Sequence, residues 1–156
     1  MLKRGALILS MWLLSVPAWA VQPGDPITPW TLLDQFDQPF TLDADTHVLL
    51  VARSMAAARL VNAALDAAPT GYLEDRHTAY IADIEHMPTV ARAFAIPAMR
   101  SARYRILLDG DGRVAPRYDG AREGVQWLEV RDGTLRAQQQ FNDAAQLRQA
   151  LERLTQ

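Results

Sequence analysis

Three side chains that could transfer protons or bind a metal come at the end of one predicted strand. Asp83, Glu85 and His86 close the apolar segment 78–84 or directly follow it. Open α/β sheets usually place their ligands at the carboxyl ends of strands. A histidine beside carboxylates can titrate near neutral pH or bind zinc. The sequence therefore suggests a metal site or an acid/base pair here, with three solvent-facing loop side chains as the alternative.

Other chemistries lack the residue patterns they need. His47 and His77 lie in separate segments and have no ligand spacing to His86. Residues 109–112 (Asp-Gly-Asp-Gly) resemble the start of a calcium loop, but the later acidic ligands are absent, so we expect a turn. Ser101 has neither a nucleophile elbow nor a nearby histidine. No phosphate loop or dinucleotide fingerprint occurs. We predict no catalytic residue, no metal ligand and no cofactor.

Three methionines are expected near the same edge of the sheet. They are Met55, Met87 and Met99. Thioether sulfur can bind copper, but methionine also fills gaps in ordinary hydrophobic cores. The sequence leaves both interpretations open.

A predicted helix start adds a group of free backbone amides. Ser54 precedes it, and the amides of residues 54–58 would carry the partial positive charge of a helix N-terminus, which can bind an anion. Every helix start has such groups, so a plain cap by Ser54 is the alternative.

The elements that would position these residues begin with a hairpin and a βα unit. Two short apolar runs, 30–33 and 40–42, flank a polar stretch and predict an N-terminal hairpin. The continuous apolar run 47–51 is typical of a strand buried on both faces of a parallel sheet. Apolar residues at helical spacing follow Ser54: Ala57, Leu60, Val61, Ala64 and Leu65.

A second βα unit and a first antiparallel pair of strands are predicted next. Segment 78–84 is a strand, and Pro88 suits the first position of a helix over 89–94 that ends or kinks near Pro97. Segment 104–108 is a strand that turns at 109–112 into a partner strand over 113–118.

The C-terminal part predicts a hairpin and a closing helix. Segments 125–131 and 134–141 are strands joined through Asp132 and Gly133. Asn142 caps an amphipathic helix whose apolar face holds Leu147, Ala150, Leu151 and Leu154. The predicted fold class is α/β, a three-layer sandwich with a mixed central sheet, an N-terminal hairpin and flanking helices.

The N-terminus predicts export. Lys3 and Arg4 precede the apolar run 6–16, and Ala18 and Ala20 suit signal peptidase, so we expect residues 1–20 to be a signal peptide cleaved before Val21. The alternative is an uncleaved anchor, although the run is shorter than the roughly 20 residues that span a bilayer. Export of a single domain, 21–156, to the bacterial periplasm is the prediction, with no membrane span after cleavage.

Charge and cysteine content limit the function classes. The 16 basic residues include two in the signal segment and face 18 acidic ones, so the exported domain carries a net charge of −4. This balance gives no electrostatic basis for binding nucleic acid. The sequence contains no cysteine, so packing alone must stabilise the domain.

The chain resembles the thioredoxin-like superfamily, in particular its exported peroxiredoxin-like and thiol-oxidoreductase-like branch. The likeness is carried by the segments 24–26, 30–34 and 39–42, which are similar to that branch's N-terminal hairpin, and by the strand 48–51. The resemblance implies a redox cysteine pair at the start of the first helix, where this chain has Ser54-Met55-Ala56-Ala57-Ala58-Arg59. It also implies a cis-proline before the strand at Tyr104, where the nearest proline is Pro97. Thiol–disulfide activity is therefore not expected.

The resulting prediction is a redox-inactive thioredoxin-like domain that works by binding another envelope protein. Its contact surface would lie near segments 54–59, 85–88 and 98–103. The binding residues predicted there are Ser54, Met55, Ala56, Arg59, His86 and Arg103. One alternative is a thiol-independent enzyme or metal-binding protein that uses Asp83, Glu85 and His86, and a purely structural envelope protein is another. The sequence leaves the oligomeric state open.

Overall fold

A computed structural model describes residues 20–154, so nearly all of the predicted signal peptide lies outside the described residues. The strands are β1 (Thr31–Asp34), β2 (Pro39–Thr41), β3 (Val48–Ala52), β4 (Thr78–Asp83), β5 (Leu107–Asp109), β6 (Val125–Arg131) and β7 (Thr134–Phe141). The helices are α1 (Met55–Leu65), α2 (Thr89–Met99) and α3 (Ala144–Glu152), with short 3₁₀ helices η1 (Glu74–Arg76) and η2 (Ala115–Arg117). Within the described range, no helix has the length and apolar character needed to cross a bilayer.

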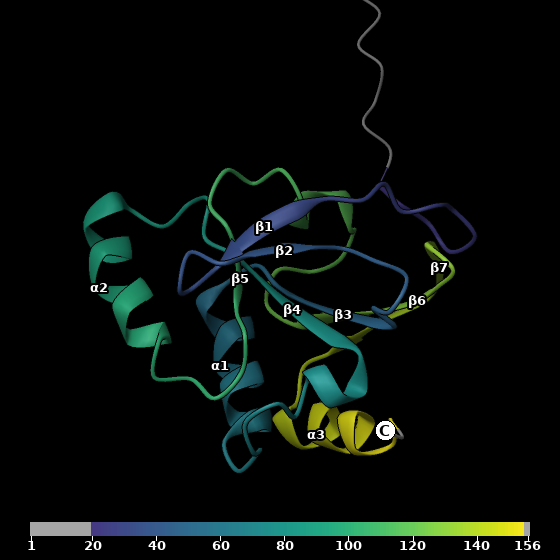
Figure 1. Cartoon of the computed structure of the whole chain (residues 1–156). Helices are drawn as coiled ribbons and strands as arrows, with labels where there is room; N and C mark the ends of the chain where they lie inside the picture. The colour runs from purple at the N-terminus through teal and green to yellow at the C-terminus, as the bar shows by residue number, and fades with distance from the viewer. Residues whose placement is uncertain (1–19, 155–156) are drawn as a thin grey trace, which may run out of the picture.

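The strands form one mixed sheet in the order β2-β1-β5-β4-β3-β6-β7 (Figure 1). The three central strands β3, β4 and β5 are parallel, because a helical crossover connects β3 to β4 and another connects β4 to β5. The hairpins β1–β2 and β6–β7 extend the sheet antiparallel on its two sides. This arrangement confirms the predicted α/β class with an N-terminal hairpin.

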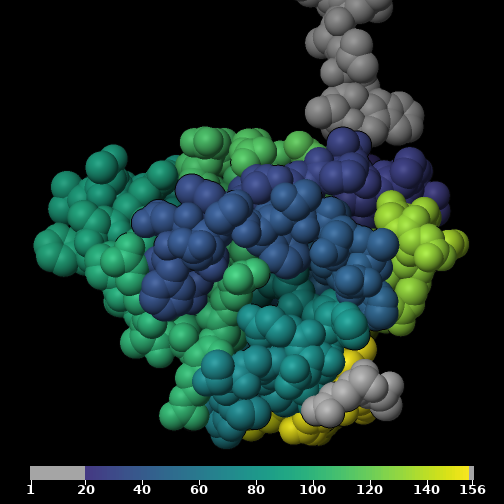
Figure 2. All heavy atoms as spheres, in the orientation of Figure 1, coloured from purple at the N-terminus to yellow at the C-terminus, as the bar shows by residue number. Residues whose placement is uncertain are grey.

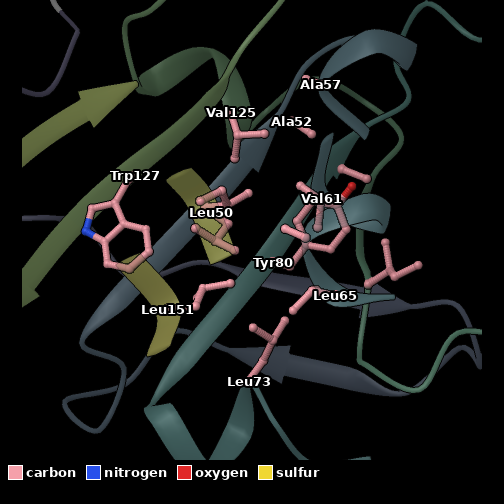
Figure 3. Close-up of a cluster of buried hydrophobic side chains, with 14 of the residues drawn as sticks. Leu50, Ala52, Ala57, Val61, Leu65, Leu73, Tyr80, Val125, Trp127 and Leu151 are labelled. Atoms are coloured by element: carbon pink, nitrogen blue, oxygen red, sulfur yellow. The ribbon is translucent and has the colours of Figure 1, made fainter. Parts of the chain in front are cut away.

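The helical face of the sheet holds the larger hydrophobic core. Every residue of β3 is buried, and Leu50 and Ala52 point to the same side as Tyr80 of β4 and Trp127 of β6. Figure 3 shows these side chains together with Val61 of α1 and Leu151 of α3. Helices α1 and α3 pack side by side over this face, so α1 is fixed between the sheet and α3.

The opposite face is covered by segments without long helices. Alternate residues of the central strands, including Leu49, Val51 and Ile81, pack there against Ala115 of η2 and Ile27 of the N-terminal segment. The indole N–H of Trp30 donates a hydrogen bond of 2.9 Å to the Tyr118 hydroxyl across this layer. The helices, the sheet, and the segments that cover its opposite face form the three layers of the domain.

The predicted strand over 113–118 is wrong, because the segment forms a loop with η2 at its centre. The cause is Asp109, which is fully buried at the end of β5. Its carboxylate accepts hydrogen bonds from the backbone N–H groups of Arg113, Val114 and Ala115. These bonds wrap the chain around the carboxylate, so it cannot run straight back as a strand.

Three predicted helix ends are also corrected. Asp143, not Asn142, caps α3 by accepting the N–H of Gln146 at 2.9 Å. Pro88 has extended backbone angles and is the N-cap of α2, one residue before the predicted position. Helix α2 continues through Pro97 and ends two residues later, at Met99.

Candidate functional site

Helices α1 and α2 leave a wide groove between them on the helical face. Its volume is about 1060 Å³. Strand β4 forms the floor, α1 forms one wall and α2 with the segment after it forms the other. All three segments that the sequence predicted as a contact surface reach this groove, and Ser54, Met55, His86 and Arg103 line it. Ala56 and Arg59 are exposed beside it without lining it.

The start of α1, where the cysteine pair was expected, is a well-formed cap. The Ser54 hydroxyl oxygen accepts the N–H of Ala57 at 3.1 Å, and the hydroxyl donates to the Arg122 carbonyl at 2.6 Å. The cap therefore also ties α1 to the segment before β6. Met55, one residue further, is 58% exposed at the mouth of the groove.

The carboxylates and histidine at the end of β4 do not converge on one point. The Asp83 carboxylate is buried, pairs with Arg53 Nε at 3.3 Å, and accepts the N–H of Glu85. The Glu85 carboxylate lies over Gly112 and is 3.8 Å from His86 Nε2, with both side chains at the surface. Among residues 20–154, no three His, Asp or Glu side chains are placed to share a metal ion.

Helix α2 is held by hydrogen bonds near its two ends and by partial packing of Ile96 and Met99 against the core. None of its residues is buried, and Val90 and Phe94 are 73% and 76% exposed. At one end the Arg92 guanidinium donates to the carbonyls of Glu85, Met87 and Gly110. At the other end Arg100 Nε donates to the Gln35 carbonyl at 2.8 Å. Figures 1 and 2 show the helix as a lobe that projects from the body of the domain.

The three methionines all line the groove, but in different environments. Met87 and Met99 are partly buried and pack against the core, as the gap-filling interpretation expects. Met55 is exposed and fills no gap. The groove is therefore bordered by flexible, polarisable side chains that can adapt to an occupant.

Sequence reasoning missed a pair of tyrosines at the floor of the groove. Tyr80 is only 2% exposed, and its ring centre lies 6.1 Å from that of Tyr104. Burial, with a smaller effect of Tyr104, raises the pKa of Tyr80 far above its ordinary value. The Tyr104 hydroxyl donates to Asn62 Oδ1 of α1, and burial raises its pKa too. Nothing in the sequence marked Tyr80 as more than a strand-forming residue.

A pair of neighbouring, tilted histidine rings at the other end of the sheet was also missed. The rings of His47 and His77 are 4.7 Å apart, because the two residues precede adjacent parallel strands. Burial, and then the positive charges of Arg131 and His77, lower the pKa of His47, while Asp45 and Asp132 oppose the shift. The signal available was their equivalent position before two predicted parallel strands.

The cis-proline that the family resemblance implies before the strand at Tyr104 is not found in the described residues. No cis peptide bond occurs in residues 20–154, and Pro97 lies inside α2.

Comparison with known proteins identifies the fold. No protein-family model and no curated protein matches the sequence. A hypothetical protein from Sinorhizobium meliloti 1021 is similar in structure, with a TM-score of 0.59, 21% identity, and coverage of 86% of this chain and 85% of that one. Peroxidoxin BcpB from Mycobacterium tuberculosis matches with a TM-score of 0.56, 16% identity, and coverage of 87% and 99%.

A third solved structure carries the same fold. The thioredoxin domain of a thiol-disulfide oxidoreductase from Bacteroides vulgatus matches with a TM-score of 0.54, 15% identity, and coverage of 87% of this chain and 100% of that one. These identities establish the architecture and not a shared activity. The chain thus has a thioredoxin-like fold, and its 156 residues contain no cysteine.

Proposed function

We propose that this protein is an exported, redox-inactive thioredoxin-like domain that acts as a binding module for another protein of the bacterial envelope. The observation that carries the proposal is α2, a helix with no buried residue that presents Val90 and Phe94 to solvent. An apolar helix in this state is typical of a surface that a partner covers. The chain has no cysteine, and residues 20–154 contain no cluster of side chains that could hold a metal ion. Neither group is therefore available to support the enzymatic alternative.

Charge around the groove indicates the chemistry of the partner surface. Arg59, Arg103 and Arg122 border this side of the domain, and none of them pairs with a carboxylate within residues 20–154. Cations around an apolar patch favour a partner with apolar residues ringed by acidic ones. Because the domain as a whole is negatively charged, other parts of its surface would repel an acidic partner. The three arginines would therefore direct such a partner to this side of the domain.

Site-specific photocrosslinking in intact cells tests the proposal. A photoreactive amino acid at position 94 of α2 should give a discrete crosslinked protein in the envelope fraction. The same group at position 136, an exposed site on β7, is the matched control and should not. Phe94→Ser should weaken recovery of that partner, whereas Leu33→Ser, at another exposed apolar position, should leave it unchanged.

Two results would contradict the proposal. One is the absence of a position-specific crosslink at residue 94 in cells that export the protein. The other is reduction of insulin disulfides or of peroxide by the purified protein, because a chain without thiols has no group of its own for that chemistry.

A further inference from the structure

The groove is too large to be a packing defect between helices. Interiors of folded proteins contain few voids larger than a water molecule. A volume of about 1060 Å³ corresponds instead to a pocket for an organic ligand. The gap persists because the α2 wall presents Ala91, Ala95 and Ala98 on one side of the helix, and their side chains are too short to reach the sheet.

The floor of the groove holds a polar group that lacks a partner. The Tyr80 hydroxyl, on a side chain that is almost fully buried, forms no hydrogen bond with any residue in the described part of the chain. Its neighbour Tyr104 is already engaged with Asn62. The hydroxyl oxygen is open to the groove and not enclosed in the core, so a ligand with an acceptor at that point can receive a hydrogen bond from it.

One end of the groove has an excess of cationic donors. Arg53 uses only its Nε to pair with Asp83, whose carboxylate also accepts a backbone N–H, so the remaining guanidinium donors of Arg53 are unused there. Arg122 lines the same end, beside Ser54, and has no carboxylate partner in residues 20–154. Asp66 lines the groove at the far end of α1. The groove therefore has a cationic end, which suits an anionic group, and an acidic residue at the far end of α1.

The remaining walls are mainly apolar and elongated. Helix α1 borders the groove from Met55 to Leu65, a length of about 16 Å at the rise of an α-helix. With C–C bonds of about 1.5 Å, an extended alkyl chain of about a dozen carbons spans roughly that distance. Ile84, Ile106 and Met99 add apolar surface along the way.

We propose that the groove binds a single-chain amphiphile whose anionic head lies near Arg53 and Arg122 and whose alkyl chain runs along α1. The head is a carboxylate or a phosphate, since either accepts several hydrogen bonds from a guanidinium. This site does not depend on the proposed protein partner, because Val90 and Phe94 do not line the groove.

Isothermal titration of the purified protein with dodecanoate tests the proposal. We expect binding of one molecule, with affinity falling about tenfold for each two methylene groups removed from the chain. Dodecyltrimethylammonium, with the opposite charge, should bind at least about tenfold more weakly. Titration with dodecyl phosphate then assigns the head, because the better of the two anions identifies the group that the arginines prefer.

Matched variants locate the bound molecule. Ala95→Trp fills the groove and should weaken dodecanoate binding more than about tenfold, whereas Ala93→Trp, on α2 but outside the lining, should not. Arg122→Gln should weaken the anion severalfold, and Arg136→Gln on β7 should have no effect.

Three outcomes would overturn the proposal. They are failure of dodecanoate to bind, equal effects of the two tryptophan variants, and equal affinity for the anionic and cationic detergents. Each is measured on purified protein alone, so a failure here is distinct from failure of the crosslinking experiment in cells.

Discussion

Helices α2 and α3 lie on the same face of the sheet, yet they are held in opposite ways. Helix α3 buries Leu147 and Leu151 completely and packs along α1. Helix α2 has no fully buried residue: Met99 packs partly against the core, and Val90 and Phe94 face solvent. Since burial of apolar surface is the main stabilising term in folding, α3 contributes to stability and α2 leaves its apolar surface available for binding.

Arginines mark the same contrast. Arg148 of α3 donates to the carbonyls of Ala63 and Ala64 and satisfies the end of α1, in addition to the packing around it. Arg92 of α2 donates to three carbonyls without such packing, so hydrogen bonds are the main attachment of that end of the helix. Helix α3 is therefore held by packing together with hydrogen bonds, whereas the start of α2 is held mainly by the hydrogen bonds of Arg92.

The two helices should differ most in how much stability is lost when an apolar side chain is truncated, because α3 buries its leucines and α2 exposes its phenylalanine. Leu147→Ala should lower the free energy of unfolding by about 3 kcal/mol, because it removes a fully buried side chain and leaves a cavity. Phe94→Ala should change it by less than about 0.5 kcal/mol, since that ring is exposed. Urea denaturation followed by circular dichroism measures both. Equal losses would show that α2 is packed.

Removal of the α2 attachment should have a smaller and more local effect. Arg92→Ala should lower the local opening free energy of α2 by about 1–2 kcal/mol, because the bonds to three carbonyls are lost. Hydrogen exchange should then be faster in α2 and unchanged in α3. Arg148→Ala is the control on α3, and a pattern in which it loosens α2 would contradict the assignment.

The cap of α3 should have an effect of about 1 kcal/mol. Asp143→Ala removes the acceptor for the Gln146 N–H and should lower the free energy of unfolding by that amount. Asp143→Asn keeps an acceptor and should restore most of it. No such loss is expected at the start of α2, where Pro88 makes no side-chain cap. Thermal denaturation of the two variants tests this prediction.

The smallest effect is a pH dependence from the neighbouring histidines. The pKa of His47 is lowered from 6.5 by burial, Arg131 and His77, so the unfolded chain takes up this proton more readily than the folded one. Stability should therefore fall as the pH drops below about 6.5. The slope of Tm against pH between 7.5 and 5.5 should be shallower in His47→Gln and in Arg131→Gln. An unchanged slope in both variants would remove His47 as its source.

Much of the fold was predictable because its signals are local. The all-apolar β3 is buried throughout, as its composition indicated. The Asp132-Gly133 pair adopts positive φ at both residues and turns β6 into β7, as a two-residue hairpin requires. The family resemblance gave the correct element order, and the confirmed fold contains no thiol at the start of α1.

The misses depend on contacts between distant residues. Segment 113–118 has the composition of a strand, but the buried Asp109 carboxylate determines its path. The neighbouring pair of His47 and His77 depends on strand pairing. The groove was not visible in the sequence, because the alanines of α2 would line a tight helix contact equally well. Its predicted contact segments nevertheless meet there, and binding through them stays a prediction.

Hydrogen exchange of the purified protein, with and without dodecanoate, tests most directly whether the α2 side is the binding side of the molecule. We expect fast exchange in α2 and slow exchange in α3 in the free protein, and selective slowing in α2 when dodecanoate is added. Slow exchange in α2 of the free protein, or protection by dodecanoate that is confined to other elements, would contradict this expectation.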